Sequence, residues 1–475
     1  MTSVPYPTFF DQIPVNTQES RTALSSVGRC RIFPDRYPQY NDVFRSIVMK
    51  SIQHAAVDLD VDDSDQRNFN KKLKKKYMKE GVALAKSFLE DTLHLDVSIV
   101  DVECYIEPND IIQTDGGIAA CFLDAGCHAI MTDGSDFRAL DVAKIPSNRL
   151  VAHFLSIPAD LAIVENASTL SSTISIAILP KEDHYIEDVK TVLELRDHVP
   201  KDLDLQIVLQ ANLAELQPSD EENVATMISN MVKVCNLSNA VISLEDPNAY
   251  ILGSVYAACV KSDRLDGLFT TVVCSRSGEA LGLVYSSKES IIASLECGRG
   301  VYYSRSRKGL WRKGDTSGHF QVLHRLDLDC DGDAIRFTVT QKGDDVAAFC
   351  HLNTFTCWGQ PRGIRHLEAT LNDRLKSAPE GSYTKRLFDD ATFLRDKLVE
   401  EAQELSEATD KKHVAEELAD VLYFAMTRAV KAGVSIDDAI EELDRRTRKV
   451  TRRQGDSKAF RIELGNSILK KNDPS

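Results

Sequence analysis

The sequence lacks an apolar run long enough to cross a membrane. Its first twenty residues, MTSVPYPTFFDQIPVNTQES, contain neither an apolar signal core nor an Arg-rich amphipathic presequence. Positive charge is scarce, because 57 Lys and Arg residues face 72 Asp and Glu residues, which gives a formal net charge of −15. A general nucleic-acid binder needs a basic surface. We therefore expect a cytoplasmic protein whose partners include neither a membrane nor a nucleic acid.

The eleven cysteines are scattered and odd in number, which fits a reducing compartment better than a disulfide framework. Only the last three, Cys330, Cys350 and Cys357, have the spacing of metal ligands. The chain has 475 residues, of which 43% are hydrophobic. This size and composition predict roughly two to four domains with buried cores.

Short apolar runs alternate with amphipathic segments between residues 94 and 261. The predicted strands are Val97–Val102, Ala129–Thr132, Leu150–Phe154, Ile174–Leu179, Leu205–Leu209 and Ala240–Leu244. The predicted helices are Ile111–Ala125, Ile186–Arg196 and Glu221–Val234. Alternation of strand and helix favours parallel pairing with right-handed crossovers. Residues 1–262 are therefore expected to form an α/β domain, an irregular or partial barrel of unassigned activity.

This N-terminal domain has no glycine fingerprint and no nucleophile motif. Asp115, Asp133 and Glu245 follow predicted strands or open turns, where α/β folds place their sites. Helix caps and turns are the better interpretation of these residues. The basic run Lys71–Lys79 leads into an apolar stripe at helical spacing, Ala83–Leu89, so a solvated helix face is favoured over a nucleic-acid site.

A second domain begins near residue 263. Phe269–Val273 and Ala280–Tyr285 predict a hairpin, and Ser286 with Glu289 predicts a capping box for a helix that ends at Cys297. The domain is expected to be mostly β, with this early helix.

Two kinds of metal ligand follow in the same domain. Asp329, Asp331 and Asp333 alternate along the chain, so an extended segment would place three carboxylates on one face, as a magnesium site requires. Thiolates and an imidazole suit zinc, and His351 stands beside the second of the three ligand-spaced cysteines. Three cysteines leave room for a water molecule on the zinc, which would make the site catalytic.

Phosphate-binding groups precede these ligands. Cations, hydroxyls and one stacking ring are supplied by Ser304, Arg305, Ser306, Arg307, Trp311, Lys313 and Ser317. Such groups suit a phosphorylated ribose that carries a purine. Taken singly, the aspartates fit an acidic turn, the cysteines fit core residues and the arginines fit a solvated face. Their convergence within one segment favours a site.

Residues 265–359 closely resemble phosphoribosyl-AMP cyclohydrolase, through the motifs YYSRSRKGLWRKGDTSG, LDCDGDA and CHLNTFTC. The resemblance implies a domain over residues 263–362 that opens the purine ring of phosphoribosyl-AMP. It implies a homodimer with zinc at the subunit interface, held by Cys330 of one subunit and by Cys350 and Cys357 of its partner. The implied magnesium ligands are the three aspartates, and His351 is the candidate for proton transfer.

A polar linker, residues 363–381, leads to two predicted helices. Glu401 and Glu404 lie beside the apolar stripe of the first, Leu387–Leu405, and Glu417 and Asp420 lie beside the stripe Val414–Ala425 of the second. Two i, i+3 pairs on facing helices would aim four carboxylates into one groove, which suits magnesium and pyrophosphate chemistry. Acidic pairs also occur by chance on charged helices. Gly433 closes the second helix, and Ser435 with Asp438 opens a third.

Residues 379–453 resemble phosphoribosyl-ATP pyrophosphohydrolase, through EEAQEL, EELAD, SYTKRLF and LDRRTRKVTRRQGD. The resemblance implies an all-α domain over residues 382–455, followed by a tail, residues 456–475. It gives the four carboxylates a catalytic, magnesium-binding role. Lys385 and Arg453 are the implied contacts to the substrate phosphates.

Together the two resemblances predict consecutive hydrolytic steps of histidine biosynthesis in a chain similar to the fungal-type multifunctional proteins. No histidinol dehydrogenase activity is expected, since the printed sequence ends at Ser475. Two alternatives stay open: a house-cleaning nucleotide pyrophosphohydrolase with a zinc-stabilised accessory domain, and a zinc-dependent binding module.

Overall fold

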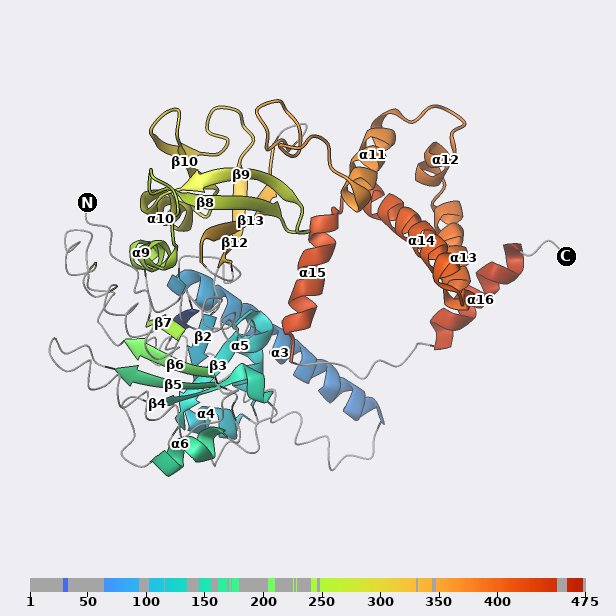
Figure 1. Ribbon diagram of the computed structural model, residues 1–475. Helices are drawn as coiled ribbons and strands as arrows, with labels where there is room; N and C mark the ends of the chain where they lie inside the picture. Colours follow the sequence, from blue (N-terminus) through green and yellow to red (C-terminus); the bar gives the residue numbers. More distant parts are fainter. Residues whose placement is uncertain are drawn as a thin grey trace. The chain divides into compact units, whose positions relative to one another are not determined.

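The computed structural model describes residues 29–32, 64–93, 102–114, 116–134, 145–154, 161–168, 171, 173–178, 204–209, 225, 228, 241–245, 248–329, 332–343, 347–450 and 459–472. The chain divides into two compact units (Figure 1). Unit 1 comprises residues 1–347 and 447–451, and unit 2 comprises residues 348–446 and 452–475.

Parallel strands of unit 1 close into a barrel in chain order (Figure 1). They are β1 (Arg29–Ile32), β2 (Val102–Tyr105), β3 (Ala129–Asp133), β4 (Leu150–Phe154), β5 (Thr173–Ile178), β6 (Asp204–Leu209) and β7 (Val241–Glu245). Closure depends on β1, which pairs with β2 on one side and with β7 on the other. The α/β prediction is confirmed, but the expectation of a partial barrel is wrong.

The predicted strands agree with the barrel except at its start. β3 to β7 lie within one residue or two of their predicted bounds, whereas β2 begins where the predicted strand Val97–Val102 ends. β1 was not predicted, because its sequence RCRI alternates arginine with apolar residues and forms no apolar run. Pairing on both edges, rather than local pattern, therefore makes this segment a strand.

The helices around the barrel are partly as predicted. The basic run lies on α3 (Ser64–Leu93), whose Phe88 is buried edge-on against Phe122, with ring centroids 6.1 Å apart. The predicted helix Ile111–Ala125 is split into α4 (Pro108–Gln113) and α5 (Gly117–Ala125), because Gly116 adopts φ 72° before α5. A 3-10 turn, η5 (Ser147–Arg149), and α6 (Leu161–Ser168) complete the set.

Three further predicted features of this domain lie wholly or largely outside the described residues. Ile186–Arg196 and Asp115 are wholly outside them, and the predicted helix Glu221–Val234 is described at residues 225 and 228, both helical.

The β-rich part of unit 1 begins with α9 (Ala249–Cys259) and contains a four-stranded sheet in the order β12-β13-β8-β9. Its strands are β8 (Phe269–Ser275), β9 (Ala280–Ser286), β12 (Gln321–Leu328) and β13 (Ala334–Gln341). A separate hairpin joins β10 (Val301–Ser304) to β11 (Gly309–Arg312). The predicted β8–β9 hairpin and the helix α10 (Lys288–Cys297) are confirmed.

The predicted cap of α10 is off by one residue. Ser287, not Ser286, is the N-cap, and its reciprocal partner is Ser290 rather than Glu289. A serine hydroxyl satisfies the N-cap amide as a glutamate does, so the two registers compete in this sequence.

Unit 2 is helical. Its elements are α11 (Gly363–Ser377), α12 (Tyr383–Asp389), α13 (Ala391–Glu407), α14 (Lys411–Lys431), α15 (Ile436–Arg448) and α16 (Ala459–Asn472). Asp390 and Asp410 cap α13 and α14 by accepting two backbone N–H bonds each. The reciprocal bonds between Ser435 and Asp438 confirm the predicted start of the third helix.

The segment predicted as a polar linker contains α11, which packs into the bundle. Leu371 of this helix is 1% exposed and packs against Phe388, Met426 and Val430. The high polarity of α11 obscured this apolar face, because only a narrow stripe of the helix is buried.

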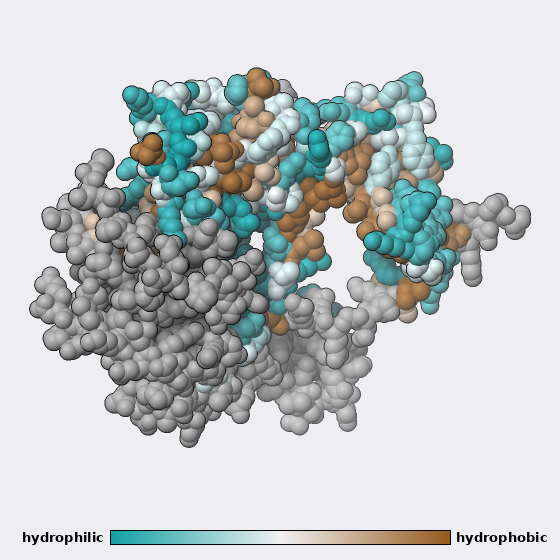
Figure 2. All heavy atoms as spheres, in the orientation of Figure 1, coloured by the Kyte–Doolittle hydropathy of each residue, from teal (hydrophilic) through white to brown (hydrophobic). Residues whose placement is uncertain are grey.

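No residue of the stripe predicted for α14 is buried, and the buried face of this helix lies at other positions. Val414, Leu418 and Leu422 remain 36%, 45% and 40% exposed, whereas Phe424 and Val430 are buried. Apolar side chains are visible at the surface of unit 2 in Figure 2. Among the described helices, none is both long enough and apolar enough to span a membrane.

Replacing Leu371 by alanine tests whether α11 belongs to the bundle. Removal of this side chain should lower the free energy of local opening of α11 and α14 by about 2–5 kcal/mol. Leu375→Ala, on the exposed side of the same helix, should change it by less than about 0.5 kcal/mol. Native-state hydrogen exchange of peptides from both helices measures this difference. Equal, small effects of both substitutions would contradict the packing described.

Candidate active sites

Three carboxylates from α13 and α14 converge in unit 2. Glu401, Glu417 and Asp420 each offer an oxygen, and these oxygens lie within 4.8 Å of one another. Glu401 is buried, Glu417 is half-buried and Asp420 is exposed, so the cluster opens to solvent on one side. The predicted spacing therefore brings the carboxylates of two helices together.

Glu404, the fourth predicted carboxylate, is at the edge of this cluster. Burial raises its pKa, and repulsion from Glu401 and Glu417 raises it further. Glu404 therefore lies close enough to Glu401 and Glu417 for the three carboxylates to repel one another.

Two nitrogen-bearing side chains, those of Lys397 and His413, face the cluster. Lys397 Nζ lies 2.7 Å from Glu401 Oε1 and 3.1 Å from Glu400 Oε1. Burial disfavours the charge of Lys397, but hydrogen bonds to Glu401 and Glu400 outweigh it and hold the pKa of Lys397 above its ordinary value. His413 Nε2 lies 3.1 Å from Glu417 Oε1.

The cluster suits a hard divalent cation. Its donors are all carboxylate oxygens, the ligands that magnesium prefers. Glu417 Oε2 is buried and makes no hydrogen bond in the described part of the chain, so a strong acceptor is left for a cation.

The cysteine pair lies on a loop of tight turns that also belongs to unit 2. Cys350 N–H donates to Thr354 O, and Asn353, at φ 57°, donates its N–H to Cys350 O. A second turn pairs Thr356 with Gly359 in both directions, at 3.1 and 3.2 Å. These turns bring Cys357 back to Cys350, and the two side chains are hydrogen bonded.

The thiol of Cys350 has a pKa below its ordinary value. A hydrogen bond from the Leu352 backbone lowers the pKa of the Cys350 thiol against the opposing effect of burial, and bonds from Thr354 and Cys357 add to this. His351 Nδ1 lies 3.8 Å from Cys350 Sγ. Two adjacent thiols beside an imidazole fit the donor chemistry of zinc. The third predicted ligand, Cys330, lies outside the described residues.

The predicted acidic run is not an extended segment where it is described. Asp329 follows β12, Gly332 adopts φ 77°, and β13 begins at Ala334. Asp329 N–H donates to Ala334 O, while Asp329 Oδ1 accepts from Ala334 N–H. The segment thus reverses direction as a hairpin connection, and the alternation argument for one shared face is wrong. Asp333 is exposed there, and Asp331 lies outside the described residues.

The predicted phosphate-binding residues occupy the β10–β11 hairpin of unit 1. Ser304 ends β10, and its hydroxyl accepts from the Arg307 N–H and lies 3.2 Å from the Ser306 hydroxyl. Arg305, Ser306 and Arg307 form the exposed turn. The guanidinium of Arg305 lies 4.3 Å from the ring centroid of Tyr285.

The other predicted substrate contacts differ from one another in burial and in their partners. Trp311 is half-buried against Tyr302, and Lys313 is 5% exposed, with its Nζ 5.8 Å from the Trp311 ring. Ser317 is exposed, and its hydroxyl accepts from His319 N–H. In unit 2, Lys385 pairs with Asp389 at 3.2 Å. Arg453 lies outside the described residues.

Two neighbouring residues were missed in the sequence. His413 stands four residues before Glu417 on one helix face, a spacing that could have identified it. Tyr285 packs under Arg305 across strands, and no local spacing announces that contact.

Matches to two family models fall side by side on the chain. The model of phosphoribosyl-AMP cyclohydrolase matches residues 282–359, and that of phosphoribosyl-ATP pyrophosphohydrolase matches residues 364–447. The first match contains the cysteine loop, and the second contains the carboxylate cluster.

Relatives that match parts of the chain carry related names. The histidine biosynthesis bifunctional protein his7 of Schizosaccharomyces pombe is 49% identical over 243 residues, which are 51% of this chain and 57% of that protein. The histidine biosynthesis trifunctional protein of Candida albicans is 35% identical over 389 residues, 80% of this chain and 42% of that protein. The chain thus spans about half the length of these fungal relatives. The histidine biosynthesis bifunctional protein HisIE of Pyrococcus furiosus is 31% identical over 202 residues, 39% of this chain and 95% of that protein.

An α/β barrel, a β-rich sheet and a helical bundle with clustered carboxylates define a multidomain protein with two candidate metal sites. More narrowly, the chain belongs to the family of histidine-biosynthesis proteins that join a phosphoribosyl-AMP cyclohydrolase domain to a phosphoribosyl-ATP pyrophosphohydrolase domain. The resemblance seen in the sequence motifs is confirmed.

Cysteine alkylation tests the described thiol environments. Cys357 is exposed, whereas Cys121 is buried and burial raises its pKa to about 12. In native, metal-free protein at pH 8, iodoacetamide should label Cys357 at least about tenfold faster than Cys121, because the thiolate is the nucleophile. Peptide mass spectrometry measures both rates, and the denatured protein serves as the control in which they converge. Similar alkylation rates of Cys357 and Cys121 in the native protein would contradict the described exposure of Cys357 and burial of Cys121.

Proposed function

We propose that this protein is a bifunctional hydrolase of histidine biosynthesis. It hydrolyses phosphoribosyl-ATP to phosphoribosyl-AMP and pyrophosphate, and then opens the purine ring of phosphoribosyl-AMP. The observation that carries the proposal is the convergence of Glu401, Glu417 and Asp420 inside the segment that matches the pyrophosphohydrolase model.

The C-terminal reaction uses the carboxylate cluster. Glu401, Glu404, Glu417 and Asp420 would hold magnesium, which when bound neutralises charge on the pyrophosphate that leaves. Lys397 holds the Glu401 side chain in place through an ion pair. His413 does the same for Glu417 when protonated. Lys385 and Arg453, with the arginines of α15, supply positive charge for the substrate phosphates.

Part of the positive charge on α15 is compensated by a glutamate of the same helix. Arg445 and Arg446 both pair with Glu442, at 2.6 and 2.8 Å. These pairs are solvent-exposed and therefore weak, so a triphosphate can displace the carboxylate.

The central reaction uses the cysteine loop. Cys350 and Cys357, with Cys330, would hold zinc, which when bound lowers the pKa of water into the neutral range. His351 stands beside Cys350, where it can carry a proton between solvent and the site. Ser304, Arg305, Ser306, Arg307, Trp311, Lys313 and Ser317 bind the phosphorylated ribose and the base. Asp329, Asp331 and Asp333 are the proposed ligands of a second magnesium ion.

The protein is further proposed to act as a cytoplasmic homodimer. The resemblance that places Cys330 on one subunit and Cys350 with Cys357 on its partner supports a zinc site shared between copies. Apolar side chains left exposed along α14 also favour self-association.

Separate substitutions should remove one reaction each. With each step supplied its own substrate, Glu417→Ala should reduce pyrophosphate release alone and Cys350→Ala should reduce ring opening alone. Each substitution should reduce the rate of its reaction by more than about a hundredfold. Loss of a residue that merely orients a metal ligand already costs about ten- to a hundredfold, and loss of a ligand itself should cost more. Pyrophosphate assays and purine absorbance measure the two steps in parallel.

Neighbouring residues provide the controls. Glu416→Ala and Cys297→Ser should leave both reactions near the parental rate, because Glu416 is an exposed residue of α14 and Cys297 ends α10, outside the cysteine loop. Pyrophosphate release without ring opening would refute the bifunctional proposal. Equal turnover of ATP and phosphoribosyl-ATP would instead favour a house-cleaning pyrophosphohydrolase.

Light scattering tests the dimer. The mass in the presence of zinc should be twice that of the chain, and chelation of zinc should shift the protein towards the single chain. A zinc-loaded monomer that retains full ring-opening activity would exclude a zinc site shared between subunits.

A further inference from the structure

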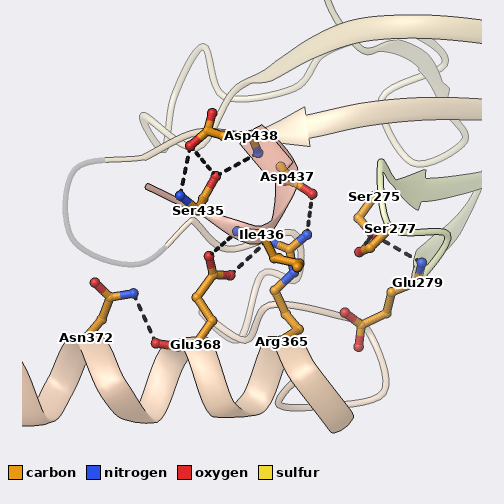
Figure 3. A network of polar contacts seen from close by, with 10 residues as sticks. All are labelled: Ser275, Ser277, Glu279, Arg365, Glu368, Asn372, Ser435, Ile436, Asp437 and Asp438. Atoms are coloured by element: carbon orange, nitrogen blue, oxygen red, sulfur yellow. Dashed lines mark hydrogen bonds and ion pairs between the residues drawn. The ribbon is translucent and has the colours of Figure 1, made fainter. Parts of the chain in front are cut away.

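A buried arginine in unit 2 contacts three separate segments. Arg365, in the first turn of α11, is 9% exposed. Its Nη1 donates to Glu368 Oε2 at 3.1 Å, and its Nη2 donates to Asp437 Oδ1 at the start of α15 (Figure 3). A buried charge of this kind is stable only when opposite charges meet it.

Glu368 extends this contact into the backbone of α15. Its Oε1 accepts from Ile436 N–H at 2.7 Å, while its Oε2 faces Arg365 (Figure 3). Ile436 is the first residue of α15, so its N–H is one of the four amides that a helix leaves without an internal partner. Arg365 and Glu368 therefore fix the first turn of α15 from α11.

The third contact is the cysteine loop. The guanidinium carbon of Arg365 lies 5.6 Å from the ring centroid of Phe355, which stands between Cys350 and Cys357. A planar guanidinium can offer its edge to two carboxylates and its face to a ring at the same time. The three segments thus meet on one side chain.

We propose that Arg365 is a positioning residue that couples metal binding at the cysteine loop to the order of the first turn of α15. The proposal rests on the zinc role given above to Cys350 and Cys357. Zinc fixes the loop and hence the Phe355 ring against Arg365. With its face held against the Phe355 ring, the guanidinium of Arg365 keeps the N–H groups on its edge directed at the carboxylates of Glu368 and Asp437.

The coupling joins the two proposed reactions. α15 carries the arginines proposed to meet the substrate phosphates of the pyrophosphohydrolase, and its first turn is what Arg365 and Glu368 hold. The zinc state of the cyclohydrolase ligand loop would in this way set the order of a helix used by the other reaction. Linkage makes this effect reciprocal. If bound zinc increases the equilibrium constant for ordering of that turn by some factor, ordering of the turn increases the affinity for zinc by the same factor.

Zinc affinity of the full chain, measured by competition with a chromophoric chelator, is the first test. Phe355→Leu removes the ring face but keeps both ion pairs, so the bundle should fold. Arg365→Lys keeps the charge but cannot reach both carboxylates and the ring together. Each variant should bind zinc about tenfold more weakly than the parent, as expected for an outer partner of a metal ligand. Glu442→Gln, which removes an exposed pair of α15, is the matched control and should bind as the parent does.

Hydrogen exchange at residues 433–440, with and without zinc, is the second test. In the parent, zinc should slow exchange of the first amides of α15 by about the same tenfold factor, as linkage requires. In Phe355→Leu this zinc-dependent protection should be lost, although a saturating concentration of zinc still binds. A purely structural arginine would not make protection at α15 depend on zinc.

The outcomes separate the coupling from the proposed function. Parental zinc affinity and parental zinc-dependent protection in Phe355→Leu or Arg365→Lys overturn the coupling, provided that Cys350→Ser has lost zinc. Parental zinc affinity in Cys350→Ser overturns the zinc role of the loop, and the coupling falls with it.

Discussion

A charged side chain that is buried away from water needs an opposite charge beside it. The helical unit meets this requirement at two places. Glu401 is 6% exposed and meets the ammonium of Lys397. Arg365 is 9% exposed and meets Glu368 and Asp437. Both arrangements hold more carboxylates than cations, but they differ in their hydrogen bonds. In the carboxylate cluster, Glu417 Oε2 has no hydrogen-bond partner among the described residues, which leaves a place for a ligand. Arg365 instead bonds both of its carboxylates, and Glu368 also caps α15, so this arrangement joins two helices.

The carboxylate cluster was predictable because a helix has a fixed period. Glu401 with Glu404, and Glu417 with Asp420, fall on one face each whatever the rest of the chain does, and facing helices then bring the pairs together. The β10–β11 hairpin, with its proposed phosphate-binding residues, and the cysteine loop were recognised by motif instead. No period governs a loop, so the turn at Asp329 and the return of Cys357 to Cys350 could not be deduced from spacing. Contacts between segments, such as Arg365 with Phe355, leave no trace in the local sequence.

The same distinction holds for the fold. Buried parallel strands are recognisable in a sequence as apolar runs, and β3 to β7 were predicted in this way. β1 carries two arginines in four residues and became a strand through its two neighbours. α11 is polar over most of its surface, and only the partners of Leu371 reveal that it is part of the bundle. Local pattern therefore predicted the elements that are apolar by themselves, and missed those that depend on distant segments.

Closure of the barrel by β1 has a consequence for synthesis. Arg29–Ile32 pairs with Val241–Glu245, and about 200 residues of chain separate the two strands. Long-range pairing of this kind is slow, because the entropy of closing the loop is lost before the contacts form. During translation the edge of β1 that pairs with β7 stays open until β7 has left the ribosome, and exposed strand edges promote association between chains. Nascent chains halted before β7 are thus the species most in need of a chaperone.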